Sequence, residues 1–590
     1  MEAAPRVLLT RRDWVFIAVC IVVIAVSTAV IANWFYSAFP EASIDFRYDG
    51  ATSKRIADSI VTSQHFDPRG MTHTVVFDSD DAARIFLERS LGLKRANDVM
   101  KRDVHLWFWH HRWFRALQEE ELAVEIAPTG ELVSMARKIP ESRRMPSVDA
   151  ATSRRLAEEF LTRAGAKDLE LISQSERQLP ARTQRIYTWR SRNVSPAGAE
   201  YRYTITVDGD SVSSYGQRLK VPDEWLRGYR ELRSKNSAAG NVDLIFLIAT
   251  AIAALVVFVT RLRRGDLHIR FLLGVGAVAF ILSAGSNLNS YPTALAFYDT
   301  TTSYPAFMAR FIFLNVLIAS IGAAMLLIVI CGAGEVLFRE RFPQHLALPK
   351  VWTPRSLTSK RVFRSIILGY TLVAFFIAYQ TIFYVIAEKF GAWAPAEIPY
   401  DNTLLNTPVP WLAVLFAGFF PAMSEEFMSR AFSIPFFERV FRFRSRIFAI
   451  VLSAYIWGFG HSTYPNQPFY IRGLEVGSAG VVLGVLLQSF GLLPLLIWHF
   501  TVDALYTALM LLRSGNIYYV ISTGVAAMVF TIPLIASIVL YIRNRGFAPD
   551  DDLSNARAPV SARDVPAEAG SHTSPLPDAV HPSRRLLIAC

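Results

Sequence analysis

The sequence predicts a polytopic all-α membrane protein of about ten transmembrane helices, with a duplicated α+β soluble module inserted after the first helix. Three observations support this fold class. The mean hydropathy of the 590-residue chain is +0.28, although 19% of its residues are charged. Residues 40–240 contain no apolar stretch long enough to cross a membrane, whereas such stretches recur from about residue 242 onward. Within the polar region, one short sequence occurs twice.

The first predicted span covers residues 14–36. It is longer than the apolar region of a secretory signal peptide, and no small-residue cleavage site follows it. Residues 1–39 are therefore interpreted as a short N-terminus and the first transmembrane anchor. Arginines at positions 6, 11 and 12 precede the span, and the positive-inside rule then places the N-terminus in the cytoplasm.

Residues 40–240 form a predicted soluble module with an internal repeat. Ala51–Ala57 (ATSKRIA) returns as Ala151–Ala157 (ATSRRLA), and each copy begins a helix that a Thr or Ser can cap. Alternating strands around a turn follow each copy, at residues 121–140 with the turn at 128–130, and at 201–222 with the turn at 208–210. We expect a helix followed by a small antiparallel sheet, twice. This pattern loosely resembles the PepSY-type modules found on some bacterial membrane proteases and sensors.

After the module, apolar segments recur up to residue 542. We expect about nine further spans, at residues 242–261, 269–288, 306–332, 363–387, 409–432, 446–461, 472–490, 492–512 and 518–542. Basic clusters follow the second, fourth, sixth and tenth spans, as a topology with both termini in the cytoplasm requires. This topology places residues 40–240 outside the cytoplasm, in a multi-pass protein of the bacterial plasma (inner) membrane.

The membrane part and the C-terminus divide into three segments. Residues 241–404 are interpreted as transmembrane helices and loops, and residues 405–546 as a core with the last helix. Residues 547–590 are rich in Pro, Ala, Ser and charge, which predicts a disordered cytoplasmic tail. Pro465 and Pro468 lie between the seventh and eighth spans, so a re-entrant segment is a second interpretation there.

Several kinds of partner and cofactor are not expected. His105, His110 and His111 alternate with tryptophans, which favours an aromatic strand over a metal site. The three cysteines have no metal-ligand spacing. Basic cytoplasmic loops explain the net charge of +11 without a nucleic acid. The sequence has neither a Gly-x-x-x-x-Gly-Lys nucleotide loop nor a His-Glu-x-x-His zinc-protease motif.

Three predicted spans carry ionisable side chains in apolar surroundings. An Asp, Lys or Arg at the centre of a membrane costs about 2.5–3.5 kcal/mol, so such residues are expected to face one another or a wet cavity. They are Glu425, Glu426 and Arg430 in the sixth span, His461 at the end of the seventh, and His499 and Asp503 in the ninth. The span limits place Glu425 and His461 late in helices of opposite direction, so one boundary is wrong or the seventh helix is short.

The spacing of these residues predicts how they meet. Glu426 and Arg430 are four residues apart and can pair across one helical turn, whereas Glu425 is rotated by about 100°. His499 and Asp503 are also four apart and share a face. This set suits hydrolysis, because a carboxylate in an apolar cavity can act as a general base and histidines can hold a water or an oxyanion.

Three motifs in this order resemble those of the CPBP family: Glu-Glu-x-x-x-Arg at 425–430, aromatic-x-x-x-His at 457–461 and His-x-x-x-Asp at 499–503. This family includes CAAX prenyl endopeptidases (CAAX prenyl protease 2), Abi proteins and lysostaphin resistance protein A-like proteins. The resemblance covers roughly residues 405–512. It implies an intramembrane glutamic endopeptidase, formerly called a metalloendopeptidase, that cleaves membrane-associated proteins or peptides, with CAAX-type processing as one form.

The resemblance also implies roles for individual residues. Glu425 would activate the water, and His461 would help to hold it. His499 and Asp503 would lie at the oxyanion side. The supporting residues would be Glu426, Arg430 and Trp457, and Trp457 stands where the family usually has Phe. Asp503 stands where the prenyl-protein branch has Asn; an ionised Asp cannot donate a hydrogen bond, so Asp503 is either protonated or orients His499.

Other interpretations remain open at this point. The site is expected to need no cofactor, with zinc bound by Glu425, His461 and His499 as the alternative. The same buried residues could serve a membrane transporter or proton relay, or a non-catalytic membrane binding protein. The expected partners are a membrane-associated protein or peptide substrate and the lipid bilayer, with no nucleic acid and no nucleotide.

Overall fold

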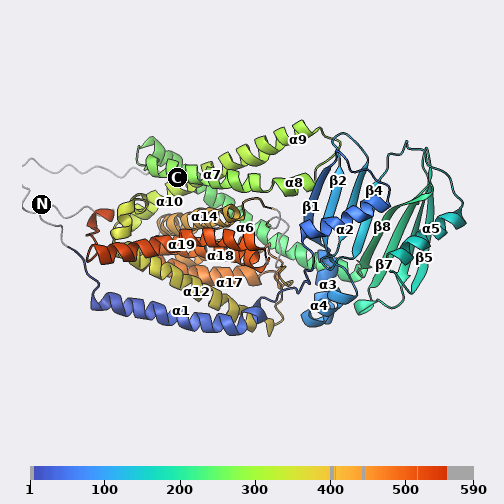
Figure 1. The fold of residues 1–590 in the computed structure, drawn as a ribbon. Coiled ribbons are helices and arrows are strands. Elements are labelled where there is room, and N and C mark those ends of the chain that lie inside the picture. Colours follow the sequence, from blue (N-terminus) through green and yellow to red (C-terminus); the bar gives the residue numbers. More distant parts are fainter. Residues whose placement is uncertain (1–5, 399–403, 405–406, 442–445, 515, 555–590) are drawn as a thin grey trace, which may run out of the picture.

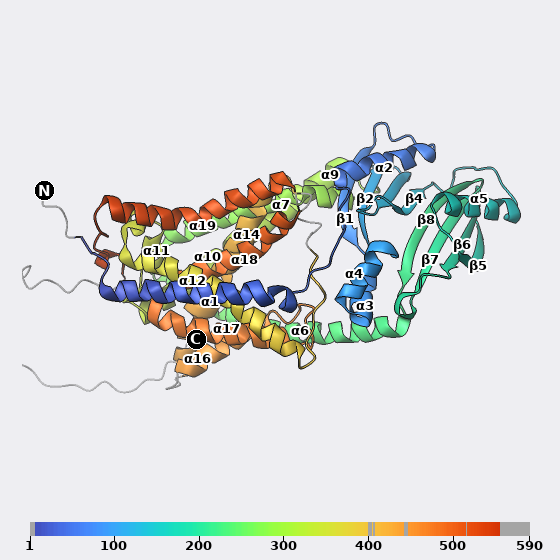
Figure 2. The same cartoon turned by 60° about the horizontal axis from the view of Figure 1, so that its bottom comes forward.

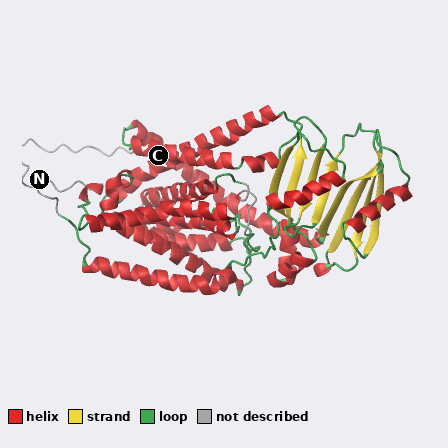
Figure 3. Ribbon diagram, viewed as in Figure 1, coloured by secondary structure: helices red, strands yellow, loops and turns green. Residues whose placement is uncertain are grey.

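The computed structural model describes residues 6–398, 404, 407–441, 446–514 and 516–554. A helical body forms one end of the molecule and a sheet-containing module forms the other (Figure 1; Figure 3). In these described ranges, nine helices are long and apolar enough to cross a membrane. The remaining predicted span is Arg446–Phe459, an apolar helix of 14 residues. The predicted fold class is therefore confirmed, with the seventh span short.

The helical body contains the long helices in chain order. They are α1 (Arg11–Ala38), α6 (Asp223–Arg263), α7 (Ile269–Asn289), α10 (Ala319–Arg341), α12 (Lys360–Glu388), α14 (Pro410–Glu425), α16 (Arg446–Phe459), α17 (Ile471–Phe490), α18 (Leu493–Arg513) and α19 (Ile517–Arg543). Shorter helices are α8 (Tyr291–Ala296), α9 (Tyr304–Arg310), α11 (Leu348–Val351) and α15 (Ile434–Val440). A π-helical segment, η2 (Phe311–Ile318), joins α9 to α10, and η4 (Glu426–Ser433) joins α14 to α15.

Helix α6 connects the two ends of the molecule. Its 41 residues begin at Asp223, well before the predicted span at 242–261. At 1.5 Å per residue the helix is about 60 Å long, roughly twice the thickness of a bilayer core. Its polar first part runs beside the module, and its apolar second part belongs to the helical body (Figure 2).

The module is one open antiparallel sheet of eight strands in the order β1-β2-β3-β4-β8-β7-β6-β5. The strands are β1 (Thr72–Ser79), β2 (Trp107–Phe114), β3 (Glu121–Ile126), β4 (Leu132–Lys138), β5 (Leu169–Gln178), β6 (Thr183–Ser191), β7 (Glu200–Asp208) and β8 (Ser211–Lys220). Each repeat supplies four consecutive strands. The repeats join where β4 pairs with β8, for example Met135 with Tyr215. The expectation of two small sheets is therefore corrected, because pairing the two inner edges leaves fewer backbone groups unpaired.

The repeated sequence forms the equivalent helices α2 (Gly50–Ser63) and α5 (Ala150–Arg163). Both lie on the same face of the sheet (Figure 1), and Ala57 and Ala157 are fully buried in one shared core. The predicted caps are wrong by a few positions. Asp49 and Asp149, rather than Thr or Ser, accept hydrogen bonds from the first turn, because a carboxylate is a stronger acceptor there. Helices α3 (Asp81–Leu91) and α4 (Leu93–Arg102) lie between the sheet and the helical body.

The histidines near residue 110 lie on strand β2, as the aromatic alternation predicts. His111 is fully buried, with Nε2 3.0 Å from the Ser53 hydroxyl and Nδ1 3.1 Å from His73 Nε2. Burial lowers the pKa of His111 to about 3 and the pKa of His73 to about 4. These contacts attach α2 to the sheet through neutral imidazoles.

Acidification is expected to destabilise the module through these two histidines. The folded protein keeps them neutral, while the unfolded chain takes up protons below its ordinary histidine pKa of about 6.5. Stability is therefore complete above about pH 6.5 and is lost as the pH falls toward 4, by up to about 5 kcal/mol at pH 4.5 for the two histidines together. Thermal unfolding of the full chain between pH 7 and 4.5, followed by the sheet's circular dichroism, measures this loss.

Matched variants test whether His73 and His111 cause that pH dependence. The double variant His73→Gln/His111→Gln should show a flatter profile, whereas His65→Gln, at an exposed histidine of the same repeat, should retain the parental slope. Equal slopes in all three proteins would contradict the assignment.

The start of the predicted disordered tail is ordered in the structure. Phe547 and Leu553 are buried, and Phe547 pairs with Val7 through backbone hydrogen bonds. Asp550 accepts hydrogen bonds from Arg361 and Ser359. Residues 547–554 therefore pack at the end of the body opposite the module, because their few apolar side chains and one acidic group find partners there. The rest of the predicted tail, 555–590, lies outside the described residues.

Candidate active site

The centre of the site lies halfway along a continuous helix. The sixth span was expected to end at residue 432, but the helix runs from Pro410 to Val440, with Glu425 at its middle. Glu425 is thus about 22 Å from the end at Val440. The short helix α16 returns over about 21 Å, which brings the residues after Phe459 to the same depth. This pairing of a long and a short helix resolves the boundary conflict in the predicted spans.

The segment that follows Glu425 is π-helical. The wider turn of η4 spans Glu426–Ser433 and packs closely on α10, where a Cβ added at Gly334 would lie 2.9 Å from the Phe427 carbonyl oxygen. π-Helical turns often occur at functional sites because they change which side chains share a face. Here the turn separates the exposed carboxylate of Glu425 from the buried carboxylate of Glu426.

Glu425 meets three aromatic or imidazole side chains. The Trp457 indole N–H donates a hydrogen bond to Glu425 Oε2. His499 Nε2 is 3.7 Å and His461 Nε2 is 4.0 Å from the same oxygen. The Glu425 side chain keeps 31% of its surface exposed. The two gaps to the histidines are longer than a direct hydrogen bond and match contacts that one water molecule bridges.

Glu426, Arg430 and His499 form a buried network behind Glu425. Arg430 donates to Glu426 Oε1 at 3.1 Å, and His499 Nδ1 donates to the same oxygen at 2.8 Å. The Arg430 guanidinium also lies over the Trp457 ring, 3.8 Å from its centroid. Arg430 and Glu426 are almost completely buried. The network fixes the orientation of the His499 ring, because its Nδ1 is bound and its Nε2 must face Glu425.

Asp503 lies one turn after His499 on α18. Its Oδ2 is 3.4 Å from His499 Nε2, and its side chain is 31% exposed. Asp503 therefore contacts the nitrogen of His499 that faces the cavity. The structure brings together every residue of the three predicted motifs.

The loop after α16 places His461. His461 Nδ1 is 3.0 Å from the Trp457 carbonyl oxygen, which can only accept, so Nδ1 carries the proton and Nε2 faces Glu425. Asn236 of α6 donates to the carbonyl oxygens of Ser462 and Asn466 in this loop. Pro465 and Pro468 also lie in this loop, between α16 and α17.

Glycines allow α16 to reach this position. A Cβ added at Gly458 would lie 2.5–2.6 Å from backbone atoms of Gly473 and Gly477 on α17. Backbone atoms cannot move aside as a flexible side chain can, so only glycine fits. The backbones of α16 and α17 therefore approach closely at Gly458.

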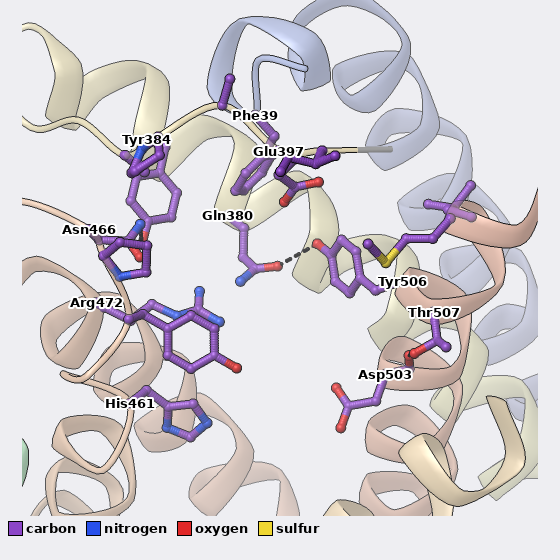
Figure 4. A pocket seen from close by; sticks show the side chains of 18 of the residues that line it. Phe39, Gln380, Tyr384, Glu397, His461, Asn466, Arg472, Asp503, Tyr506 and Thr507 are labelled. Atoms are coloured by element: carbon purple, nitrogen blue, oxygen red, sulfur yellow. Dashed lines mark hydrogen bonds between the residues drawn. The ribbon is translucent and has the colours of Figure 1, made fainter. Parts of the chain in front are cut away.

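A cavity of about 1090 Å³ opens from these residues. Glu425, His461, His499 and Asp503 all line it. In Figure 4, His461 and Asp503 face the cavity from opposite sides. The cavity reaches from the middle of the helical body to the module, where burial raises the pKa of Asp78 and of Glu397 on its wall.

A second buried polar cluster lies on the cavity wall, and the sequence reasoning missed it. Glu475 of α17 is fully buried, pairs with Arg472 and accepts a hydrogen bond from Gln380 at 3.0 Å. Tyr506 of α18 donates to Gln380 at 2.9 Å (Figure 4). The sequence does contain the feature that could have identified it: Arg472 and Glu475 stand three residues apart at the start of an apolar span. Charged residues close together in an apolar span also identified Glu426 and Arg430.

The zinc alternative would need Glu425, His461 and His499 to converge on one metal ion. In the ranges that the structure describes, no group of three or more His, Cys, Asp or Glu side chains is arranged to hold a metal ion. The Glu425 oxygen nearest both histidines already accepts the Trp457 N–H, and His499 is directed by Glu426. These residues do not fit a zinc ion in this arrangement. The expectation of a cofactor-free site stays a prediction.

The fold and the site define a polytopic membrane protein with a cluster of carboxylates and histidines inside its helical body. Residues 407–505 match the Rce1-like family model, described as type II CAAX prenyl endopeptidase Rce1-like, so this segment of the chain is similar to that family. The nine long apolar helices of the described residues are those of a multi-pass membrane protein, and the matched segment is similar to membrane proteases of the CAAX endopeptidase kind. No curated protein and no solved structure matches the chain. The family match does not extend to residues 40–240, so the likeness to PepSY modules stays a prediction.

Proposed function

We propose that the protein is an intramembrane endopeptidase of glutamic type, which hydrolyses peptide bonds of membrane-associated proteins or peptides with a water activated by Glu425. The observation that carries this proposal is the position of the Glu425 carboxylate. It lies on the cavity wall, partly exposed, with the Nε2 atoms of two histidines 3.7 and 4.0 Å from one oxygen.

The attacking water occupies the gap between Glu425 and His461 in this mechanism. His461 Nε2 is unprotonated and accepts a hydrogen bond from the water, while Glu425 removes the other proton as the water oxygen adds to the scissile carbonyl carbon. Glu425 then passes its proton to the amide nitrogen as the C–N bond breaks. The products are a carboxylate and an amine, and no covalent intermediate with the enzyme forms.

In this proposal, His499 stabilises the developing oxyanion. Its Nδ1–H donates to Glu426, so Nε2 can donate toward the substrate only when His499 is an imidazolium, the form that the neighbouring carboxylates of Glu425, Glu426 and Asp503 favour. Asp503 acts on His499 rather than on the oxyanion: its Oδ2 lies 3.4 Å from Nε2, where its negative charge stabilises the imidazolium that donates to the oxyanion. In this role Asp503 can remain ionised. An Asp that donated a hydrogen bond to the oxyanion would have to be protonated.

The proposed location is the bacterial plasma membrane with both termini in the cytoplasm. The start of α1 lies at the end of the helical body opposite the sheet (Figure 1), and Val7, just before α1, pairs with Phe547. With the basic clusters at that end, the positive-inside rule supports an extracytoplasmic module. The substrate class extends to CAAX-type processing as the family name describes it.

Comparative membrane proteomics tests the proposed function. Cells carrying wild-type protein are compared with cells carrying Glu425→Ala at equal membrane levels, and new protein termini are mapped. We expect a set of cleavage sites in or beside membrane segments that is lost in the variant. Identical terminal peptides in both cell lines, with both proteins inserted, would count against an endopeptidase. Ion flux by reconstituted protein without cleavage would instead favour the transporter interpretation.

A further inference from the structure

A short segment separates the catalytic cavity from a second cavity. The segment, here called the strap, comprises residues 392–398 after α12. Residues 394–398 line the catalytic cavity, and residues 392–394 and 396 line a neighbouring cavity of about 260 Å³. The strap therefore has open space on two sides, in contrast to the packed helices around it.

The module supplies the facing wall of the catalytic cavity. The end of β1 and the start of α3 contribute Asp78, Ser79, Asp81, Arg84 and Ile85 to its lining. The cavity that contains Glu425 is thus bounded partly by the helical body and partly by the repeat module. No span limit or motif in the sequence connects residues 78–85 with residue 425.

Helix α3 binds the strap through both backbone groups of one residue. The Arg84 guanidinium donates to the Ala396 carbonyl oxygen at 2.8 Å, and the Ala396 N–H donates to Glu88 at 3.0 Å. Arg84 and Glu88 are 3.0 Å apart, and their side chains are only 6% and 7% exposed. A buried ion pair that satisfies both polar groups of a backbone residue is a specific attachment, since either partner alone would leave buried groups unpaired.

The strap is also attached to the loop that carries His461. Trp393 exchanges two backbone hydrogen bonds with Gln467, at 2.8 and 2.9 Å. The guanidinium of Arg89 lies 4.2 Å from the Trp393 ring centroid. At its other end, Glu397 exchanges backbone hydrogen bonds with Pro40 and Ala42. The strap thus connects α3, the residues after α1, and the catalytic loop.

We propose that α3 and the strap form the entrance to the catalytic cavity, and that the Arg84–Glu88 attachment sets how wide a polypeptide can pass to Glu425. The substrates are then proteins whose extramembranous segment enters between the module and the helical body. This inference rests on the proposed function only for the statement that Glu425 is where the substrate reacts; the entrance itself is a property of the fold.

Cysteine labelling with reagents of two sizes tests the entrance. Cys20, Cys331 and Cys590 are replaced by Ala, and Met510→Cys places one thiol on the cavity wall. The full chain in lipid nanodiscs is treated with N-ethylmaleimide or with a maleimide carrying a polyethylene glycol chain. We expect the small reagent to react readily and the large reagent to react at least about tenfold more slowly, a difference of about 1.4 kcal/mol.

Two variants should widen the entrance. Arg84→Gln/Glu88→Gln removes the ion pair without leaving a single buried charge, and it should raise the rate with the large reagent by about fivefold or more. Arg89→Ala removes only an exposed side chain and its contact with Trp393, and it should raise that rate by about two- to fivefold. The control is Arg95→Ala, an exposed arginine on α4 outside the cavity lining, which should label at the parental rate.

Unchanged rates with the large reagent in both entrance variants would overturn the proposal. An equal increase for the large reagent in the Arg95→Ala control would also overturn it, because the effect would then be unspecific. Labelling requires no catalysis, so the same series in a Glu425→Gln background should give the same rates. A failure of the catalytic assignment of Glu425 would leave the labelling result unaffected, so the two failures are distinguishable.

Discussion

Purified Glu425→Gln protein is expected to lose at least about a thousandfold in kcat/KM against any peptide that the wild-type enzyme cleaves. An amide cannot take a proton from water, and a positioned general base contributes about 10²–10⁴-fold. The folded structure should be retained, because the carbonyl oxygen of the introduced amide can still accept the Trp457 N–H. Cleavage of peptides identified by membrane proteomics, assayed in detergent beside a thermal unfolding scan, measures both quantities.

A carboxylate outside the lining of the catalytic cavity provides the matched control. Glu388→Gln changes an exposed carboxylate at the end of α12 in the same way and should keep kcat/KM within about twofold. Glu425→Asp separates base strength from position: it keeps the charge but withdraws it by one carbon–carbon bond, and it should retain a small part of the activity. Full activity of Glu425→Gln would contradict the glutamic mechanism even if every other residue of the motifs proved essential.

The sequence predicted the site because charge is rare inside a membrane. Glu425, Glu426, Arg430, His499 and Asp503 each stand out in an apolar span, and helical spacing then predicts which side chains share a face. The structure places each group within 4 Å of the next: Arg430 pairs with Glu426, Glu426 contacts His499, and His499 contacts both Asp503 and Glu425. Residue type and helical period were sufficient for this part of the prediction.

The depth of the site could not be predicted in the same way. The hydropathy pattern predicted that the sixth span ends near residue 432, whereas the helix continues through η4 and α15 to Val440. Near that end, Arg439 pairs with Glu340 of α10, and Glu438 pairs with Arg341 of α10. Tertiary ion pairs of this kind extend a helix beyond the apolar segment, and a single span does not contain that information.

The sequence pattern also could not predict the long-range strand pairing of the module. Alternation and turns identified the hairpins of β3–β4 and β7–β8. The pairing of β4 with β8 brings together residues that are about eighty positions apart, through three Cα partners. No local periodicity distinguishes one shared sheet from two separate sheets. The contact of Arg84 with Ala396, more than three hundred residues away, escapes local patterns for the same reason.

Removal of the Arg430 guanidinium is expected to destabilise the helical body by about 3–5 kcal/mol. Glu426 is fully buried and pairs with Arg430 at 3.1 Å, so Arg430→Met leaves a buried carboxylate without its cation. His499 would remain as the other partner of Glu426 Oε1, but Arg430 would no longer hold that oxygen in place, so the His499 ring would be less firmly oriented. Thermal unfolding in a mild detergent should therefore show a large decrease in Tm together with loss of cleavage.

A compensating second change distinguishes a buried-charge penalty from a loss of packing. In Glu426→Gln/Arg430→Met the uncompensated charge is gone, and we expect most of the lost stability to return, because replacing both partners of a buried pair is often neutral. Cleavage should stay low, since the introduced amide does not hold His499 as the Glu426 carboxylate does. At the partly exposed Arg341–Glu438 pair, Arg341→Met should cost about 1 kcal/mol or less. If the double variant were as unstable as Arg430→Met alone, packing of the guanidinium over Trp457, rather than charge balance, would be the main contribution of Arg430.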